Sequence, residues 1–192
     1  MTDQILTRST APAVLVTLAD AKLHCRVDHT DDDAFITGLV SAVEAVLDGP
    51  SGMVGKALAT QSWTLTRGAM FGADQLAIPV LPFISVTSIK YYDDTNTQIT
   101  LDAGEYVAFG GEDFGYINPV TAWPAMYNRL DTFELIVSCG FSTVPANLIV
   151  AAKMLVSHWY ENREATSETD LKDVPFAVEH MVNLNRIGWV AA

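Results

Sequence analysis

Basic residues are scarce in this sequence. Its 192 residues include 11 Lys and Arg against 23 Asp and Glu, so the formal net charge is −12 and the isoelectric point is about 4.5. Proteins that grip nucleic acid place clustered Lys and Arg against phosphates, whereas these basic residues stand singly along the chain. The composition therefore excludes a DNA-gripping protein, and it predicts an acidic surface that keeps DNA from adhering.

Cysteine and long apolar runs are also scarce. The two cysteines, Cys25 and Cys139, do not suggest a secreted disulfide scaffold, and we expect two buried thiols in a reducing cytoplasm. The longest apolar run, residues 76–86, is interrupted by Pro79 and Pro82 and is too short to span a membrane. The first residues show no basic segment followed by an apolar stretch, so we expect no signal peptide.

Apolar residues, in contrast, are plentiful. They make up 49% of the chain, and the mean hydropathy of +0.22 is high for a soluble monomer. A chain of this length forms one domain with an elaboration, or two small domains. We therefore expect a substantial core and, in addition, apolar surface that serves partners.

The first part of the chain shows helical periodicity after an N-terminal arm. Residues 1–16 indicate the arm, and the segment from Thr17 to Asp20 fits a capping box that opens a short helix. The acidic residues 28–33 suit the positive end of a second helix, which carries an apolar stripe. The Gly-Pro pair at residues 49–50 ends that helix.

From Gln61 onward the apolar period becomes two, which is typical of half-buried strands. Turn residues separate the strand segments, as at residues 93–96 and 110–111. These patterns predict an all-β block. Its predicted strands cover residues 63–66, 84–92, 98–101, 105–109, 115–117 and 133–139.

The helical period returns at Pro145 and continues to Arg163, and a last helix is expected to begin near Pro175 after an acidic linker. Helices thus flank the β block on both sides. The expected fold class is α+β, a helical bundle formed from both chain ends with an inserted antiparallel β subdomain. The expected divisions are 1–60 for the arm and first helices, 61–142 for the β subdomain, and 143–192 for the last helices and terminal tail.

Residue types that bind metals gather in one short segment: His24, Cys25 and His29 beside Asp28 and Asp31. A closed zinc site needs four ligands, and no second Cys/His pair follows at a suitable distance. The aspartates also lack the register of a calcium-binding EF-hand loop. A helix end followed by a capping turn explains the segment better, although a metal-dependent hydrolase using His24, His29 and the nearby Asp residues stays an alternative.

Other candidate sites have similarly simple structural explanations. The glycine-rich residues 110–115 lack the ending of a phosphate-binding loop. His158 and Glu161 could be an acid–base pair, but no nucleophile or second carboxylate lies at a suggestive spacing from them. Residues 158–164 indicate instead an aromatic core face with a charged rim, in which Arg163 stacks on Trp159. We expect no catalysis and no cofactor.

A carbohydrate-binding module is a second alternative. Trp63, Tyr91 and Tyr92 of the β block could form its aromatic platform. Packing within the core or the sheet accounts for these three residues better.

Four segments in a fixed order carry a family resemblance. They are the N-terminal residues 16–33, Thr-Gln-Ser-Trp at 60–63, residues 81–93, and Val-Pro at 144–145 followed by His-Trp-Tyr-Glu-Asn-Arg-Glu at 158–164 and Pro-Phe at 175–176. By their order and spacing the chain resembles the head–tail connector (adaptor) proteins of long-tailed bacteriophages and phage-derived gene transfer agents. It departs from them at residues 48–52, Asp-Gly-Pro-Ser-Gly, where relatives often have Glu-x-x-Thr-Gly.

The resemblance implies a structural virion protein of the neck, assembled in the host cytoplasm. Relatives form a ring, usually of twelve subunits, below the portal protein; the ring extends the DNA channel and supports the next neck or tail component. Another neck protein, a stopper or tail terminator, is an alternative, but those proteins are mostly β. No membrane partner is implied.

Two sets of partner-facing residues are expected in such a ring. An acidic lumen face that lets DNA slide without specific binding is predicted at Asp31, Asp32 and Asp33 or in the acidic linker. The C-terminal Ile187, Trp189 and Val190 are predicted to anchor on the portal, as the terminal segment does in relatives. Neighbouring copies are expected to bury the excess apolar surface.

Overall fold

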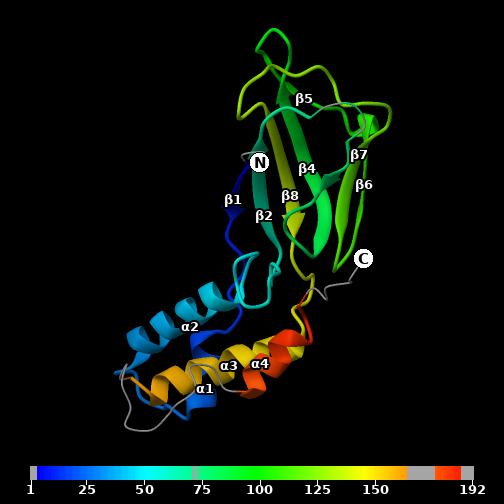
Figure 1. The fold of residues 1–192 in the computed structure, drawn as a ribbon. Helices are drawn as coiled ribbons and strands as arrows, with labels where there is room; N and C mark the ends of the chain where they lie inside the picture. Colours follow the sequence, from blue (N-terminus) through cyan, green and yellow to red (C-terminus); the bar gives the residue numbers. More distant parts are fainter. Residues whose placement is uncertain (1–3, 71, 73, 164–175, 187–192) are drawn as a thin grey trace. The chain divides into compact units, whose positions relative to one another are not determined.

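A computed structural model describes residues 4–70, 72, 74–163 and 176–186. The chain divides into two compact units, one containing residues 1–13 and 59–141 and the other containing residues 14–58 and 142–192. The first is a β unit and the second is helical (Figure 1). The predicted mixed α+β class is therefore confirmed.

The β unit contains two antiparallel sheets. One has the strand order β1-β2-β8-β4-β5 and the other has the order β3-β7-β6 (Figure 1). The strands of the larger sheet are β1 (Gln4–Thr10), β2 (Gln61–Arg67), β8 (Phe133–Cys139), β4 (Phe83–Tyr92) and β5 (Gln98–Thr100). Those of the smaller sheet are β3 (Leu76–Ala77), β7 (Gly115–Pro119) and β6 (Tyr106–Gly110).

The period-two pattern of β2 and β8 builds the core of this unit. Directly opposed residues of an antiparallel pair lie on the same face, and Leu65 is opposite Leu135, with both side chains buried. Phe133 on the same face of β8 is fully buried, and it packs edge-to-face with the Trp123 ring, with 5.5 Å between the ring centroids. The alternation therefore marks the core face of the sheet correctly.

Residues 4–10 form strand β1 at the edge of the larger sheet, which differs from the predicted N-terminal arm. Gln4 is opposite Arg67 of β2, and the pairing continues to Thr10. Six of the seven β1 residues are exposed, and Leu6 alone is half-buried. Because an edge strand with so little burial needs no apolar alternation, its sequence carries no strand pattern.

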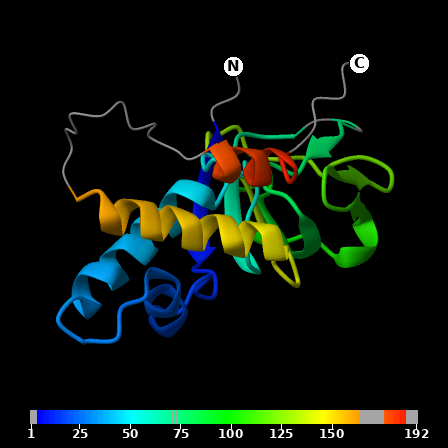
Figure 2. The same ribbon diagram turned by 90° about the horizontal axis from the view of Figure 1, so that it is seen from below.

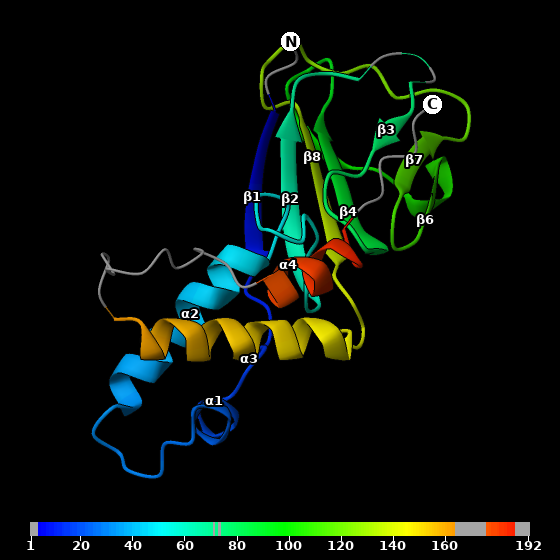
Figure 3. The same cartoon turned by 60° about the horizontal axis from the view of Figure 1, so that its bottom comes forward.

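The helical unit contains α1 (Leu18–Cys25), α2 (Asp33–Leu47), α3 (Ala146–Glu161) and α4 (Phe176–Asn183). Helix α3 lies against each of the other three (Figures 2 and 3). It buries one apolar face completely: Leu148, Ala151, Ala152, Leu155 and Val156. Within the described residues, none of the helices has the length and apolar character needed to cross a membrane.

Local signals fix the ends of α1. The Thr17 hydroxyl accepts a hydrogen bond from the Asp20 amide at 3.1 Å, which confirms the predicted capping box. At the other end Arg26 takes a left-handed conformation with φ of 59°, and its N–H donates to the carbonyl groups of Leu23 and Lys22. Glycine is the usual residue at such a helix end because a Cβ is disfavoured there.

Candidate functional site

The predicted metal-type ligands do not form a cluster. Within the described ranges, no three His, Cys, Asp or Glu side chains are grouped so that they could hold a metal ion. His29 Nδ1 is 3.9 Å from the Asp31 carboxylate, and His24 is exposed on α1.

Both cysteines are free thiols. Cys139 is buried, and this burial raises its pKa to about 12, so the thiol stays protonated and unreactive. Cys25 is half-buried, which differs from the prediction that both thiols are buried; of the α1 residues, Ala21 is the one that is fully buried. Neither thiol is an activated nucleophile.

The acidic turn before α2 is bound to the end of α3. Asp32 occupies the N-cap position of α2, but its side chain makes no cap hydrogen bond. Instead, its carboxylate accepts from the Tyr160 hydroxyl at 2.5 Å and from Arg163 Nη2 at 3.1 Å. These bonds lower the pKa of Asp32, the Tyr160 bond most strongly, and the same bond raises the pKa of Tyr160, which stays a donor.

Arg163 stacks on different rings from the one predicted. Its guanidinium lies 4.6 Å from the ring centroid of Phe35 and 4.8 Å from that of Tyr160, not over Trp159. Helix α3 ends at Glu161 with Asn162 as its C-cap, so Arg163 lies outside the helix and the expected helical spacing from Trp159 no longer applies.

The three aspartates of the predicted acidic face are in different surroundings. Asp33 is 2.5 Å from Lys22 Nζ, and Asp32 is paired with Arg163, so cations offset both charges. The Asp31 side chain is 91% exposed. The structure therefore leaves Asp31 as the most solvated charge of the three.

We predict that Asp32→Asn destabilises the helical unit in a pH-dependent way. A carboxylate whose folded pKa is lowered adds stability above its unfolded pKa of about 4, and that stability is lost as pH falls through the folded pKa. The variant should therefore melt below the parent at pH 7, and the gap should close towards pH 2. Thermal unfolding followed by circular dichroism measures this, with Asp31→Asn as the matched control. A gap of equal size at both pH values would contradict the prediction.

The aromatic platform of a carbohydrate module is not formed. Trp63 is 8% exposed, the Arg8 guanidinium lies 5.1 Å from its ring centroid, and its Nε1 donates to Gln61. The guanidinium of Arg129 covers the Tyr92 ring, with its Cζ 4.0 Å from the ring centroid. Both rings are therefore covered within the β unit, in agreement with the core and sheet packing predicted for them.

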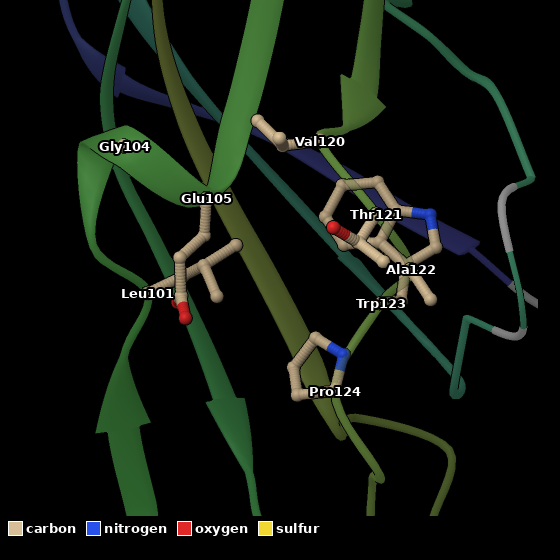
Figure 4. A pocket seen from close by; sticks show the side chains of 8 residues that line it. All are labelled: Leu101, Gly104, Glu105, Val120, Thr121, Ala122, Trp123 and Pro124. Atoms are coloured by element: carbon tan, nitrogen blue, oxygen red, sulfur yellow. The ribbon is translucent and has the colours of Figure 1, made fainter.

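A hollow of about 320 Å³ lies in the β unit, between the η1 turn (Ala103–Glu105) and the segment after β7 (Figure 4). Its lining residues are Leu101, Gly104, Glu105, Val120, Thr121, Ala122, Trp123 and Pro124. Glu105 is the single titratable side chain among them, and the Trp123 indole N–H already donates to the Asp74 carbonyl at 2.7 Å. Among its described lining residues, Glu105 therefore has no partner group of the kind that acid–base chemistry requires.

Two other surfaces expose apolar side chains. The β6–β7 hairpin carries the first, which we call the aromatic face: Val107, Phe109, Phe114 and Tyr116, with exposed fractions of 59%, 67%, 42% and 39%. The second is a shallow hollow of about 580 Å³ beside α1, which we call the α1 hollow: Leu18, Ala19, Lys22, Leu23, Val27 and Asp33. Neither surface was predicted from the sequence, because exposed apolar residues in strands and helices show the same periodicity as core residues.

Comparisons with known proteins give matches among solved structures. No protein-family model and no curated protein matches the sequence. The chain resembles solved structures described as the neck of an empty gene transfer agent (GTA) particle computed with C6 symmetry, the virion of a native GTA particle, and the neck of a native GTA particle computed with C12 symmetry. Their TM-scores are 0.73, 0.70 and 0.67.

Each of these matches has 20% sequence identity and covers 97% of both chains. At this identity the likeness shows that the fold is shared. Because the coverage is nearly complete, the shared fold includes both the β unit and the helical unit.

Proposed function

We propose that this chain is a structural neck protein of a tailed-phage or GTA particle, located in the virion and assembled in the host cytoplasm. One observation supports this most: the fold matches GTA neck and virion structures over 97% of both chains. The sequence resemblance to head–tail connectors over residues 16–186 is an independent argument for the same class.

Within the neck, the proposed role is that of the connector, or adaptor. In this role the chain forms a ring below the portal, extends the DNA channel and links the head to the next neck or tail component. Its helical unit, proposed as the bundle formed from both chain ends, favours this role over that of a stopper or tail terminator, which are mostly β. We assign it no catalytic role.

A ring of twelve copies is the proposed assembly. Two of the similar neck structures were computed with C6 and C12 symmetry, both of which are compatible with twelve subunits. The exposed aromatic face and α1 hollow supply the apolar surface that neighbouring copies would bury.

The acidity of the chain suits a collar through which DNA moves. A net charge of −12 on each subunit would not clamp phosphates, so the duplex would pass without specific binding. We propose that Asp31 and Asp32 face the lumen, with Asp33 at the border between this acidic face and the contact with the neighbouring copy. The proposed portal anchor at Ile187, Trp189 and Val190 lies outside the residues that the structure describes.

Electron microscopy of the purified protein at high concentration tests this function. We expect rings with a central opening, whose mapped lumen is acidic. Removing residues 187–192 should leave the rings intact but prevent them from binding purified portal. A strict monomer under all conditions would refute the connector, a basic lumen would refute the acidic collar, and portal binding by the shortened chain would refute the anchor.

A further inference from the structure

Copies in a closed ring of more than two subunits contact each other head to tail, so each copy must present two different surfaces that complement one another. We propose that the aromatic face of one copy packs into the α1 hollow of the next copy. This inference rests on the proposed ring, and it identifies the two surfaces that build it.

The aromatic face has the features of an interface core. Phe109 and Tyr116 are directly opposite each other in the β6–β7 pair, so both lie on one face of the hairpin. Phe114 lies 5.5 Å from Phe109 and 6.4 Å from Tyr116, measured between ring centroids, and joins them into one cluster. Exposed clustered aromatic rings are the side chains that most often anchor protein–protein contacts.

The α1 hollow offers a complementary apolar surface. Leu23 is 80% exposed on α1, and Leu18 and Val27 line the hollow beside it. The two charged lining residues, Lys22 and Asp33, are 2.5 Å apart and offset each other. An aromatic side chain can therefore enter without burying an uncompensated charge.

Charge favours the same pairing. Copies that each carry −12 repel one another, so contact is easiest where acidic residues of one copy meet basic residues of the next. The hairpin turn carries Glu112 and Asp113, both exposed. Arg26, the exposed C-cap residue of α1 next to the lining residue Val27, supplies such a basic residue beside the α1 hollow.

The conformation of Arg26 is a further indication. Arg26 is exposed and has φ of 59°, a region that disfavours residues with a Cβ, and glycine would fit this helix end better. Strained residues of this kind tend to occur at functional positions. An arginine here is explained if its side chain binds the acidic turn of the neighbouring copy.

Two variants, each with one of the two contact surfaces disabled, test the pairing. Phe109→Glu disables the aromatic face and Leu23→Glu disables the α1 hollow, and each variant alone is expected to stay monomeric. Mixed together, they retain one intact surface of each kind, so native mass spectrometry should show a 1:1 heterodimer that grows no further. Leu130→Glu and Leu184→Glu, at side chains that are 75% and 67% exposed elsewhere, are the matched controls and should form rings.

Arg26 supplies a variant in which folding and assembly are expected to change in opposite directions. Arg26→Gly removes the Cβ that the left-handed conformation disfavours, so the monomer should melt at the same or a higher temperature. The protein concentration at which half of the chains are assembled should nevertheless be roughly ten-fold higher than for the parent, as expected when an interfacial ion pair is lost. Arg26→Glu should weaken assembly further, and adding Glu112→Arg should restore it.

The outcomes separate this inference from the proposed function. If the parent chain forms rings and Phe109→Glu or Leu23→Glu also forms them, the pairing is wrong while the connector function stands. If the parent chain never assembles, the connector function itself fails. A heterodimer from the mixture, together with rescue by the charge swap, would establish the pairing.

Discussion

Replacing Phe133 by Ala should destabilise the β unit by about 3–5 kcal/mol, the usual cost of removing a large buried aromatic side chain. Phe133 has no exposed surface and packs edge-to-face with the Trp123 ring. Residue 133 also lies opposite Arg67 of β2 and Tyr91 of β4, so its backbone is flanked on both sides by strands of the sheet. The cavity would open inside the core, next to paired strands that limit its collapse.

Hydrogen exchange measured by mass spectrometry locates this loss. Peptides from β2 and β8 should lose protection by roughly a hundred-fold to several thousand-fold, the range that corresponds to about 3–5 kcal/mol. Phe109→Ala is the matched control, because the same chemical change is made in the same unit at a side chain that is 67% exposed. The control should stay within about 1 kcal/mol of the parent, and similar losses in both variants would show that Phe133 is not a core residue.

Gly140→Ala is expected to have an effect of comparable size for a different reason. Gly140 has φ of +113°, and a Cβ there would lie 2.2 Å from the Ala59 carbonyl oxygen and 2.6 Å from its carbon. The backbone has little freedom to move, because the Gly140 N–H donates to the Pro82 carbonyl and Phe141 bridges to Ala59. Strain and overlap together should cost about 3 kcal/mol or more.

Urea unfolding followed by the same exchange experiment measures the Gly140→Ala effect. Gly111→Ala is the appropriate control, since Gly111 belongs to the same unit and a Cβ there would meet nothing within 4 Å. This control should change stability by less than about 1 kcal/mol. If Gly140→Ala were as stable as Gly111→Ala, the close approach of residues 59 and 140 would be wrong.

The sequence predicted the elements whose side chains are strongly patterned. The strands expected at residues 84–92 and 133–139 are β4 and β8, and the helix expected from Pro145 is α3. In each of them, burial on one face imposes the period that the sequence shows. The capping box at Thr17 was equally clear, because it depends on residues three positions apart.

Elements and contacts set by tertiary structure were not predictable in this way. Strand β1 pairs through its backbone with a strand more than fifty residues away in the sequence. Because its side chains are mostly exposed, their sequence shows no pattern that would indicate this pairing. The bond from Tyr160 to Asp32 joins residues 128 positions apart. The sequence identified the acidic turn as a helix-capping segment. Only the packing of α2 on α3 places the Tyr160 hydroxyl and the Arg163 guanidinium next to Asp32 in this turn.

The topology of β1 also restricts how this gene could exchange segments with related genes. Residues 59–141 begin and end at neighbouring backbones, as the bridge between Ala59 and Phe141 shows, which is the usual mark of a portable insertion. The sheet nevertheless takes its edge strand from residues 4–10, upstream of α1. An insertion moved into a chain without an equivalent of residues 4–10 would leave β2 with a bare edge, so the two segments have to be transferred together into such a chain.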